Sequence, residues 1–187
     1  NNGDGVDVPM ATEVPLLETN PESALLIKYA SNAFLATRIS FINEVAGICE
    51  HVGANVLDVA EGLGYDPRIG REYLEAGIGF GGPCLEKDMK AFIQFSQACN
   101  YDPVLLQAVL DRNDQQIQYV VRRTKQILGG DLANKKIAIF GLSFKAGTND
   151  IRGSIPMRIL DILMNEGAEV CSHDPVAIPQ AMEIIPQ

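Results

Sequence analysis

The longest uninterrupted helical pattern in the chain lies between Asn20 and Gly53, and it constrains the fold more than any other feature. Asn20, Pro21 and Glu22 have the order of a helix start: a capping side chain, a proline in the first turn and an acid near the positive end. Apolar residues then recur at helical spacing, interrupted by a single glycine, Gly47. A helix of about 30 residues is roughly 45 Å long. Such a rod needs partners on several sides, so it predicts the spine of a helical domain or of a dimer.

Further helices are expected in the same part of the chain. Apolar spacing and turn residues predict four segments in order: a short helix over 55–61, a loop over 65–70, a helix over 84–98 and a long helix over 103–128. Residues 71–76 are charged and also look helical. We therefore expect a mainly α-helical central domain over residues 20–130, with residues 1–19 as a linker from a preceding domain.

The pattern changes after residue 131. A strand over 136–141, a helix over 154–165 and a strand over 168–173 form a βαβ unit, which is the opening of a parallel, Rossmann-like sheet. A parallel sheet requires further strands and cover on both faces. We therefore expect residues 131–187 to be a partial α/β domain.

Charge and hydropathy restrict the possible partners. The formal net charge is −9, which disfavours nucleic acid because its phosphates repel an acidic protein. No apolar run approaches the ~20 residues of a membrane-spanning helix, so we expect no membrane partner. An anionic small ligand would need a local cluster of positive charge, for which Arg68, Lys145 and Arg152 are the candidates.

The chain contains four cysteines and no CxxC pair: Cys49, Cys84, Cys99 and Cys171. This spacing favours free thiols in a reducing compartment, and hence a cytoplasmic protein, over a disulfide framework. No metal site is expected, since only His51 and His173 are available to assist the thiols. We expect Cys49, Cys99 and Cys171 to lie in the core.

Cys84 differs from the other cysteines because it stands between a glycine-rich segment, 77–82, and a predicted helix. A thiol at a helix N-terminus meets the positive end of the helix dipole and unpaired N–H groups, and both favour the reactive thiolate. The glycines let backbone donors approach a ligand closely. Asp88 lies four residues further on and shares a helix face with Cys84. The alternative is a small buried core thiol.

Lys28 and Asn32 have the same four-residue spacing on the first long helix. If the two helix faces meet, a cation, an amide, a thiol and a carboxylate come together. Such a group suits acyl transfer, because it combines a nucleophile, oxyanion stabilisers and a group that orients water. Taken alone, Lys28 and Asn32 are more typical of a solvated helix face.

Gly77, Gly79 and Gly82 match the spacing of a dinucleotide-binding fingerprint, but the surrounding pattern is wrong. The fingerprint follows a strand, and an acid ends the next strand. Here helical patterns flank the glycines, and the true strand-to-helix turn, 141–148, lacks the fingerprint. The chain therefore contains no convincing nicotinamide-cofactor domain of its own.

Six segments taken together resemble the UDP-glucose/GDP-mannose dehydrogenase family. They are 27–36 (IKYASNAFLA), 42–44 (INE), 66–70 (DPRIG), 79–88 (GFGGPCLEKD), 141–145 (GLSFK) and 150–152 (DIR). The resemblance implies an enzyme of three parts: an N-terminal Rossmann domain that binds NAD, a central helical domain that forms a homodimer through its long helix, and a C-terminal Rossmann-like domain that grips the nucleotide. On this basis the chain is the central domain and the start of the C-terminal one, and the NAD-binding domain is absent.

The resemblance also implies an activity. Family members use two NAD to oxidise the C6 alcohol of a nucleotide sugar to a carboxylate. By motif position, Cys84 would attack the intermediate aldehyde and carry first a thiohemiacetal and then a thioester. Lys28 and Asn32 would stabilise the oxyanion, and Asp88 would orient or activate the water that releases the acid.

Binding roles follow from the same resemblance. The nucleotide sugar would be contacted by residues of both domains: Tyr73, Leu74, Phe80, Gly81, Gly82, Phe144 and Lys145. Arg68 would reach the substrate of the neighbouring subunit, and Arg152 would approach the NAD. Three residues depart from the family pattern: Pro83 replaces a commoner Ser or His, Glu86 a usual Pro or Gln, and Gly153 a usual Glu. Glu86 places a negative charge near Cys84, which disfavours the thiolate.

Segment 66–70 and the long-helix motif favour UDP-glucose as the substrate, with UDP-glucuronate as the product. The turn over 141–148 also resembles GDP-mannose dehydrogenases, which are the close alternative. The N-acetylmannosamine branch is less similar, because it lacks the Lys-Asp pair after the cysteine. An alternative of another class is a helical dimerisation module that has no activity by itself.

Overall fold

The structure is a computed structural model that describes residues 15–185. Most of the linker predicted over 1–19 therefore lies outside the described residues. Among the helices of the described part, none is both long and apolar enough to cross a membrane.

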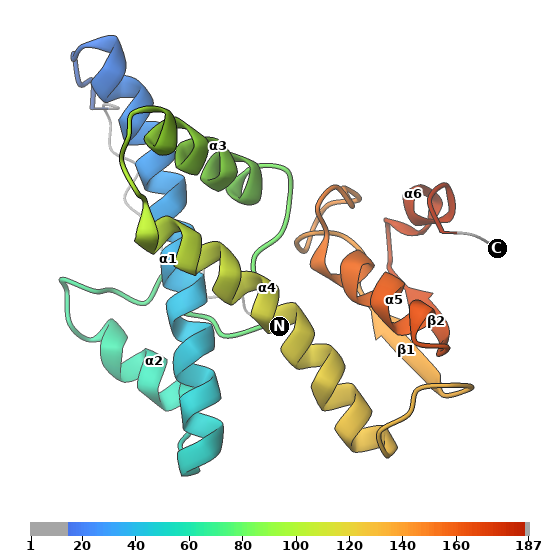
Figure 1. Ribbon diagram of the computed structural model, residues 1–187. Coiled ribbons are helices and arrows are strands. Elements are labelled where there is room, and N and C mark those ends of the chain that lie inside the picture. Colours follow the sequence, from blue (N-terminus) through green and yellow to red (C-terminus); the bar gives the residue numbers. More distant parts are fainter. Residues whose placement is uncertain (1–14, 186–187) are drawn as a thin grey trace.

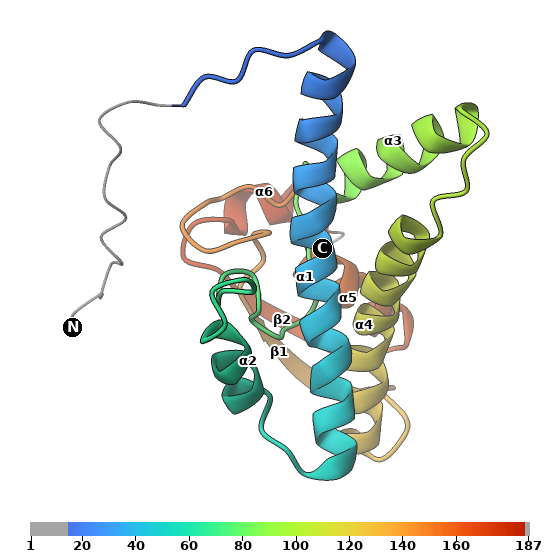
Figure 2. The same cartoon turned by 90° about the vertical axis from the view of Figure 1, so that its left-hand side faces the viewer.

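The long helix predicted from the sequence is confirmed as α1 (Pro21–Val52). It begins where the Asn20 side chain accepts a hydrogen bond from the backbone N–H of Ser23 at 2.8 Å. It ends at Gly53, whose φ of 72° is the left-handed conformation that terminates many helices. In both views α1 is the spine of the helical part (Figure 1, Figure 2).

Three helices pack around this spine: α2 (Val56–Gly64), α3 (Leu85–Ala98) and α4 (Val104–Leu128). α3 and α4 contribute Met89 and Val109 to a buried cluster with Ala33 and Ala36 of α1. The two alanines let the neighbouring helices come close to α1, so the packing brings the start of α3 against the first half of the spine.

The second part of the chain is a βαβ unit, as predicted. β1 (Lys136–Phe140) and β2 (Glu169–His173) pair in parallel, and α5 (Ile155–Asn165) connects them. A short helix, α6 (Ile178–Met182), follows. α5 covers one face of the two-stranded sheet, whereas Phe140 on the other face is 81% exposed.

α4 joins the two parts into one body. Its second half places Ile117 and Val121 in a buried cluster with Ile155 and Ile159 of α5. Figure 1 shows α4 running from the group around α1 to the side of the sheet. The apolar contact between α4 and α5 therefore packs the α/β part against the helical part.

Two local predictions are wrong. α2 continues through Gly62 to Gly64 instead of ending at residue 61, because burial of the apolar side of the helix outweighs the weak helix propensity of glycine. Residues 71–76 are not helical. Tyr73 has a left-handed φ of 59°, and the Arg38 guanidinium donates to the carbonyl of Glu72 at 2.8 Å. Tertiary contacts thus override the local helical pattern.

Three cysteines were expected in the core, and of these Cys49 is buried whereas Cys99 and Cys171 are exposed. Cys99 caps the exposed C-terminal end of α3, and Cys171 lies on the open face of the sheet. The strand pattern at Cys171 alternates between exposed and half-buried residues because only one sheet face is covered.

Candidate functional site

Cys84 is the N-cap residue of α3 and is exposed. Its carbonyl accepts the first helical hydrogen bond, from the backbone N–H of Asp88 at 2.9 Å. Its side chain makes no capping hydrogen bond. The thiol is therefore accessible at the positive end of a helix, as the sequence predicted, and the core-thiol alternative is wrong.

Lys28, Asn32 and Asp88 meet where α1 crosses α3. One carboxylate oxygen of Asp88, Oδ2, accepts hydrogen bonds from Lys28 Nζ at 2.9 Å and from Asn32 Nδ2 at 2.7 Å. Asp88 is 3% exposed, so the carboxylate is held in one orientation by two donors. The four-residue spacings on the two helices do place these side chains on facing surfaces.

Electrostatics within this group are set by the same contacts. The hydrogen bond from Lys28 holds the pKa of Asp88 below its usual range; Asn32 adds to the effect, and burial opposes it. The hydrogen bond to Asp88 raises the pKa of Lys28. Asp88 is therefore a carboxylate and Lys28 an ammonium at neutral pH, and the low pKa makes Asp88 a weak base.

A cleft of about 470 Å³ opens beside Cys84 and is lined from both parts of the chain. α1 contributes Asn32, and the second part contributes Phe144 and Lys145. Between these walls lie the remaining predicted site residues that reach the cleft: Tyr73, Phe80, Gly81, Gly82 and Cys84. Thus a single cleft gathers residues that are more than a hundred positions apart in the sequence.

The glycine-rich segment that forms one wall is held by Asn113 of α4, which sequence reasoning missed. Asn113 is 3% exposed; its Oδ1 accepts from the Phe80 N–H at 2.8 Å, and its Nδ2 donates to the Phe80 carbonyl at 3.0 Å. A Cβ on Gly79 would lie 2.6 Å from Asn113 Oδ1. One feature of the sequence could have pointed to Asn113: it is a polar residue midway between the apolar Val109 and Ile117, at the four-residue spacing where the buried face of a helix is expected to be apolar.

The same segment touches the second part of the chain directly. The Gly82 N–H donates to the Gly153 carbonyl at 2.9 Å. A Cβ on Gly153 would lie 2.9 Å from the Gly82 carbonyl oxygen, and Gly153 has a left-handed φ of 62°. Gly153 therefore stands where the two backbones are too close for a side chain.

Asp174 fixes the turn that carries Phe144 and Lys145, and it too was missed. Its carboxylate is 5% exposed and accepts four backbone hydrogen bonds, from the N–H groups of Leu142, Ser143, Val176 and Ala177 at 2.7, 3.2, 2.9 and 2.7 Å. These bonds, led by the one from Leu142, hold the pKa of Asp174 far below its usual range against the effect of burial. Because Asp174 occupies the N–H groups after β1, they are not free to bind a dinucleotide phosphate there.

Five predicted residues are not part of the cleft lining: Lys28 and Asp88, which pair with each other, and Leu74, Arg68 and Arg152. Leu74 is 2% exposed in a cluster with Ile42 and Ala60. Arg68 is at the surface and pairs with Asp66, and Arg152 pairs with Asp150 at 2.7 Å. In residues 15–185, no group of three or more His, Cys, Asp or Glu side chains is placed to hold a metal ion.

Known proteins are similar to this chain over most of its length. Residues 22–115 match the model of the UDP-glucose/GDP-mannose dehydrogenase family, central domain, and residues 138–186 match the UDP binding domain of the same family. The UDP-glucose 6-dehydrogenase TuaD of Bacillus subtilis is 47% identical over 171 residues, which are 91% of this chain and 37% of that protein. The UDP-glucose 6-dehydrogenase of Rickettsia typhi is 44% identical over 90% of this chain and 39% of its own length.

Solved structures give the same result. A UDP-glucose dehydrogenase from Pyrobaculum islandicum superposes with a TM-score of 0.90 at 40% identity, covering 93% of this chain and 40% of that one. A GDP-mannose dehydrogenase from Pseudomonas aeruginosa gives a TM-score of 0.52 at 28% identity, over 89% of this chain and 37% of that one. The chain thus spans about two fifths of the length of these relatives.

Proposed function

Because the chain belongs to the UDP-glucose/GDP-mannose dehydrogenase family, we propose that it supplies the catalytic centre and the nucleotide grip of an NAD-dependent UDP-glucose 6-dehydrogenase. The observation that carries the proposal is the exposed Cys84 thiol at the start of α3, in a cleft lined from both parts of the chain. A reducing compartment, the cytoplasm, suits an enzyme that depends on a free thiol.

When bound to the full-length enzyme, NAD would supply the oxidising power for both oxidation steps as the hydride acceptor. In residues 15–185 the glycine-rich segment follows no strand, and Asp174 already uses the N–H groups after β1. These residues therefore do not fit the main NAD-binding site, and Arg152 is proposed only as a contact to the cofactor.

Cys84 is proposed to act on the aldehyde level of the substrate. Its thiolate sulfur forms a bond to the C6 carbonyl carbon, and the carbonyl oxygen becomes the oxyanion of a thiohemiacetal. Loss of a hydride converts this adduct to a thioester. Water then adds to the thioester carbon, the C–S bond breaks, and the carboxylate leaves with Cys84 restored as the thiol or thiolate.

Lys28, Asn32 and Asp88 are proposed to serve these steps together. Asn32 lines the cleft and Lys28 shares the Asp88 Oδ2 acceptor with it, and the two donors would stabilise the developing oxyanion. We assign Asp88 to holding these donors and orienting the water, because its lowered pKa makes it a weak proton acceptor.

UDP-glucose is the proposed substrate, and GDP-mannose is the rival. The 0.90 TM-score with a UDP-glucose dehydrogenase, against 0.52 with a GDP-mannose dehydrogenase, supports the first. Tyr73, Phe80, Gly81, Gly82, Phe144 and Lys145 line the cleft that would hold the sugar nucleotide. Leu74 is buried, so we assign its contact to the backbone.

A homodimer through α1 is proposed as the assembly. Ile27, Phe34, Phe41 and Ile48 repeat every seven residues along α1 and are 49%, 62%, 52% and 58% exposed. Such a stripe is typical of an interface. Arg68, exposed at the surface, would reach the substrate of the second subunit across it. The scaffold alternative, a dimerisation module without activity, applies to the 187-residue chain by itself, which we expect to turn over no substrate.

Mutation of the nucleophile in the full-length enzyme tests the chemistry. Cys84→Ser should abolish formation of UDP-glucuronate, measured by NAD reduction and by product chromatography, and Cys99→Ser is the matched control with full activity expected. Acid formation by the Cys84→Ser enzyme at the wild-type rate would reject the proposed nucleophile. Parallel assays with UDP-glucose and GDP-mannose decide between the two substrates.

A further inference from the structure

The first turn of α3 carries two carboxylates that point in different directions. Asp88 contacts Lys28 and Asn32 of α1. Glu86 faces the second part of the chain, where its Oε2 lies 3.7 Å from Nη1 of Arg158 on α5. The turn that follows Cys84 is therefore connected on one side to the spine helix and on the other to the α/β part.

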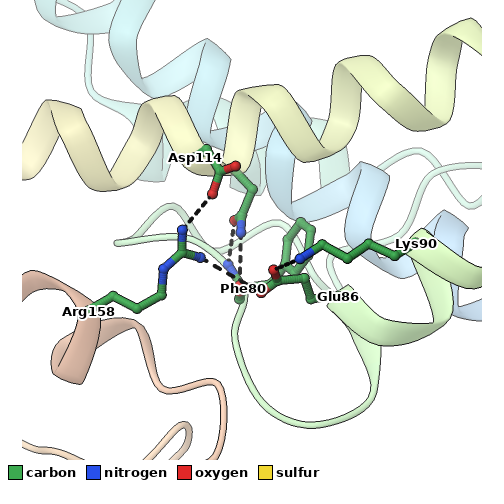
Figure 3. A network of polar contacts seen from close by, with 6 residues as sticks. Phe80, Glu86, Lys90, Asp114 and Arg158 are labelled. Atoms are coloured by element: carbon green, nitrogen blue, oxygen red, sulfur yellow. Dashed lines mark hydrogen bonds and ion pairs between the residues drawn. The ribbon is translucent and has the colours of Figure 1, made fainter.

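Arg158 joins three helices at this point (Figure 3). Its Nη2 donates to Oδ1 of Asp114 on α4 at 2.8 Å, while Nη1 faces Glu86 on α3. Glu86 also binds Lys90 at 2.5 Å one turn further along α3. Nη1 is buried and makes no hydrogen bond, so Glu86 supplies the charge that compensates this buried end of the guanidinium.

The apolar contact between α4 and α5 does not by itself define where α5 sits relative to α3. The cluster that joins them contains Ile117, Val121, Ile155 and Ile159, and none of its members comes from α3. Arg158, in the first turn of α5, supplies a direct contact between α5 and α3 through Glu86. It lies close in sequence to Gly153, whose carbonyl accepts the hydrogen bond from Gly82.

We propose that Arg158 is a positioning residue that sets the orientation of the Cys84 turn, through Glu86, relative to the part of the chain that carries Phe144 and Lys145. In this account the Glu86 charge is held by Arg158 and Lys90 rather than left facing the thiol. The inference rests on the proposed function only in taking Cys84 as the nucleophile.

Hydrogen–deuterium exchange of the 187-residue chain tests the link, read from peptides covering residues 85–92 of α3. Loss of a partly exposed ion pair such as Arg158–Glu86 can change the equilibrium constant for local opening by up to about fivefold. Arg158→Gln should therefore speed exchange of the 88–90 amides by about three- to fivefold and leave peptides from residues 38–46 of α1 unchanged. Arg158→Lys should restore most of the protection. Arg123→Gln, the same change on α4, should have no effect on α3.

Glu86→Gln provides the second arm. It should reproduce the faster exchange, and the double variant with Arg158→Gln should accelerate exchange by less than the product of the two single effects, because both substitutions remove the same Arg158–Glu86 link. The proposal is overturned if α3 exchange in Arg158→Gln matches the wild type. It is equally overturned if α1 and α3 accelerate by one common factor, or if the two substitutions add. The measurement uses neither substrate nor NAD, so its failure is distinguishable from failure of the Cys84 chemistry.

Discussion

Replacement of Asp174 by asparagine is the substitution whose cost follows most directly from the structure. The carboxylate follows β2 and accepts two backbone N–H groups on each oxygen, those of Leu142 and Ser143 on Oδ2 and those of Val176 and Ala177 on Oδ1. Asparagine has the same shape but carries an NH₂ group in place of one oxygen. Whichever way the amide turns, two N–H donors then face another donor, one of them from a buried hydrogen bond and the other from a part-buried one.

Two charge-assisted hydrogen bonds are lost and two donors are left unpaired. Hydrogen bonds to charged groups contribute about 1.5–3 kcal/mol each, so Asp174→Asn should lower the free energy of unfolding by about 3–6 kcal/mol. With a urea slope of about 2 kcal/mol per molar, the unfolding midpoint should fall by about 1.5 M or more. The turn that carries Phe144 and Lys145 should loosen with it.

Urea unfolding followed by far-UV circular dichroism is the suitable assay, because the chain contains no tryptophan. Asp161→Asn is the matched control: it makes the same chemical change at an exposed position on α5 and should cost no more than about 0.5 kcal/mol. If Asp174→Asn unfolds within about 0.5 kcal/mol of this control, the four hydrogen bonds do not stabilise the turn and the reasoning is refuted.

Acid provides an independent test of the same carboxylate. The pKa of Asp174 is lower in the folded chain than in the unfolded chain. Its contribution to the free energy of unfolding is therefore fully present above the unfolded-state pKa of about 3.9, and it is lost as the pH falls from there toward the folded-state pKa. The unfolding free energy of the wild type should therefore drop between about pH 4 and pH 2. Asp174→Asn should show a shallower drop, and an identical slope in both proteins would contradict the assignment.

Three further substitutions test the cleft and the interface. Gly82→Ala places a Cβ 2.5 Å from the Phe144 ring at a residue with a left-handed φ. It should therefore displace that ring and lower the affinity for UDP-glucose in calorimetric titrations. Gly77→Ala is the control, because a Cβ at Gly77 meets open space and should leave the affinity unchanged. Asn113→Leu leaves the N–H and carbonyl of Phe80 unpaired and should cost about 2–4 kcal/mol of unfolding free energy; an unchanged urea midpoint would contradict this. Phe41→Glu should convert the proposed dimer to a monomer in sedimentation velocity, and a dimer that persists would place the interface elsewhere.

The helices and the facing side chains were predictable because their signals are local and periodic. Asn20 and Gly53 mark the ends of α1 by capping chemistry, and the apolar row between them has helical spacing. The four-residue spacings in α1 and α3 put Lys28, Asn32 and Asp88 on surfaces that meet. The shared face on each helix needs only the geometry of that helix, whereas the meeting of the two faces was a condition that the structure supplies.

The residues that hold the loops were not predictable in the same way. Asn113 binds backbone groups 33 positions away, and two of the four N–H groups that Asp174 binds are 32 and 31 positions away. Nothing in their own neighbourhood shows where those loops pass. Tyr73 similarly adopts its left-handed conformation within a segment held by tertiary contacts, against a helical local pattern. The link between Arg158 and Glu86 likewise depends on how two parts of the chain dock.

Site-resolved alkylation with iodoacetamide, with and without UDP-glucose, tests the central claim most directly. The exposed Cys99 at the other end of α3 is an internal control on the same helix. If the cleft beside Cys84 holds the sugar nucleotide, saturating UDP-glucose should slow labelling of Cys84 several-fold and leave labelling of Cys99 unchanged. Equal labelling of Cys84 in the presence and absence of UDP-glucose would contradict a substrate site at this sulfur.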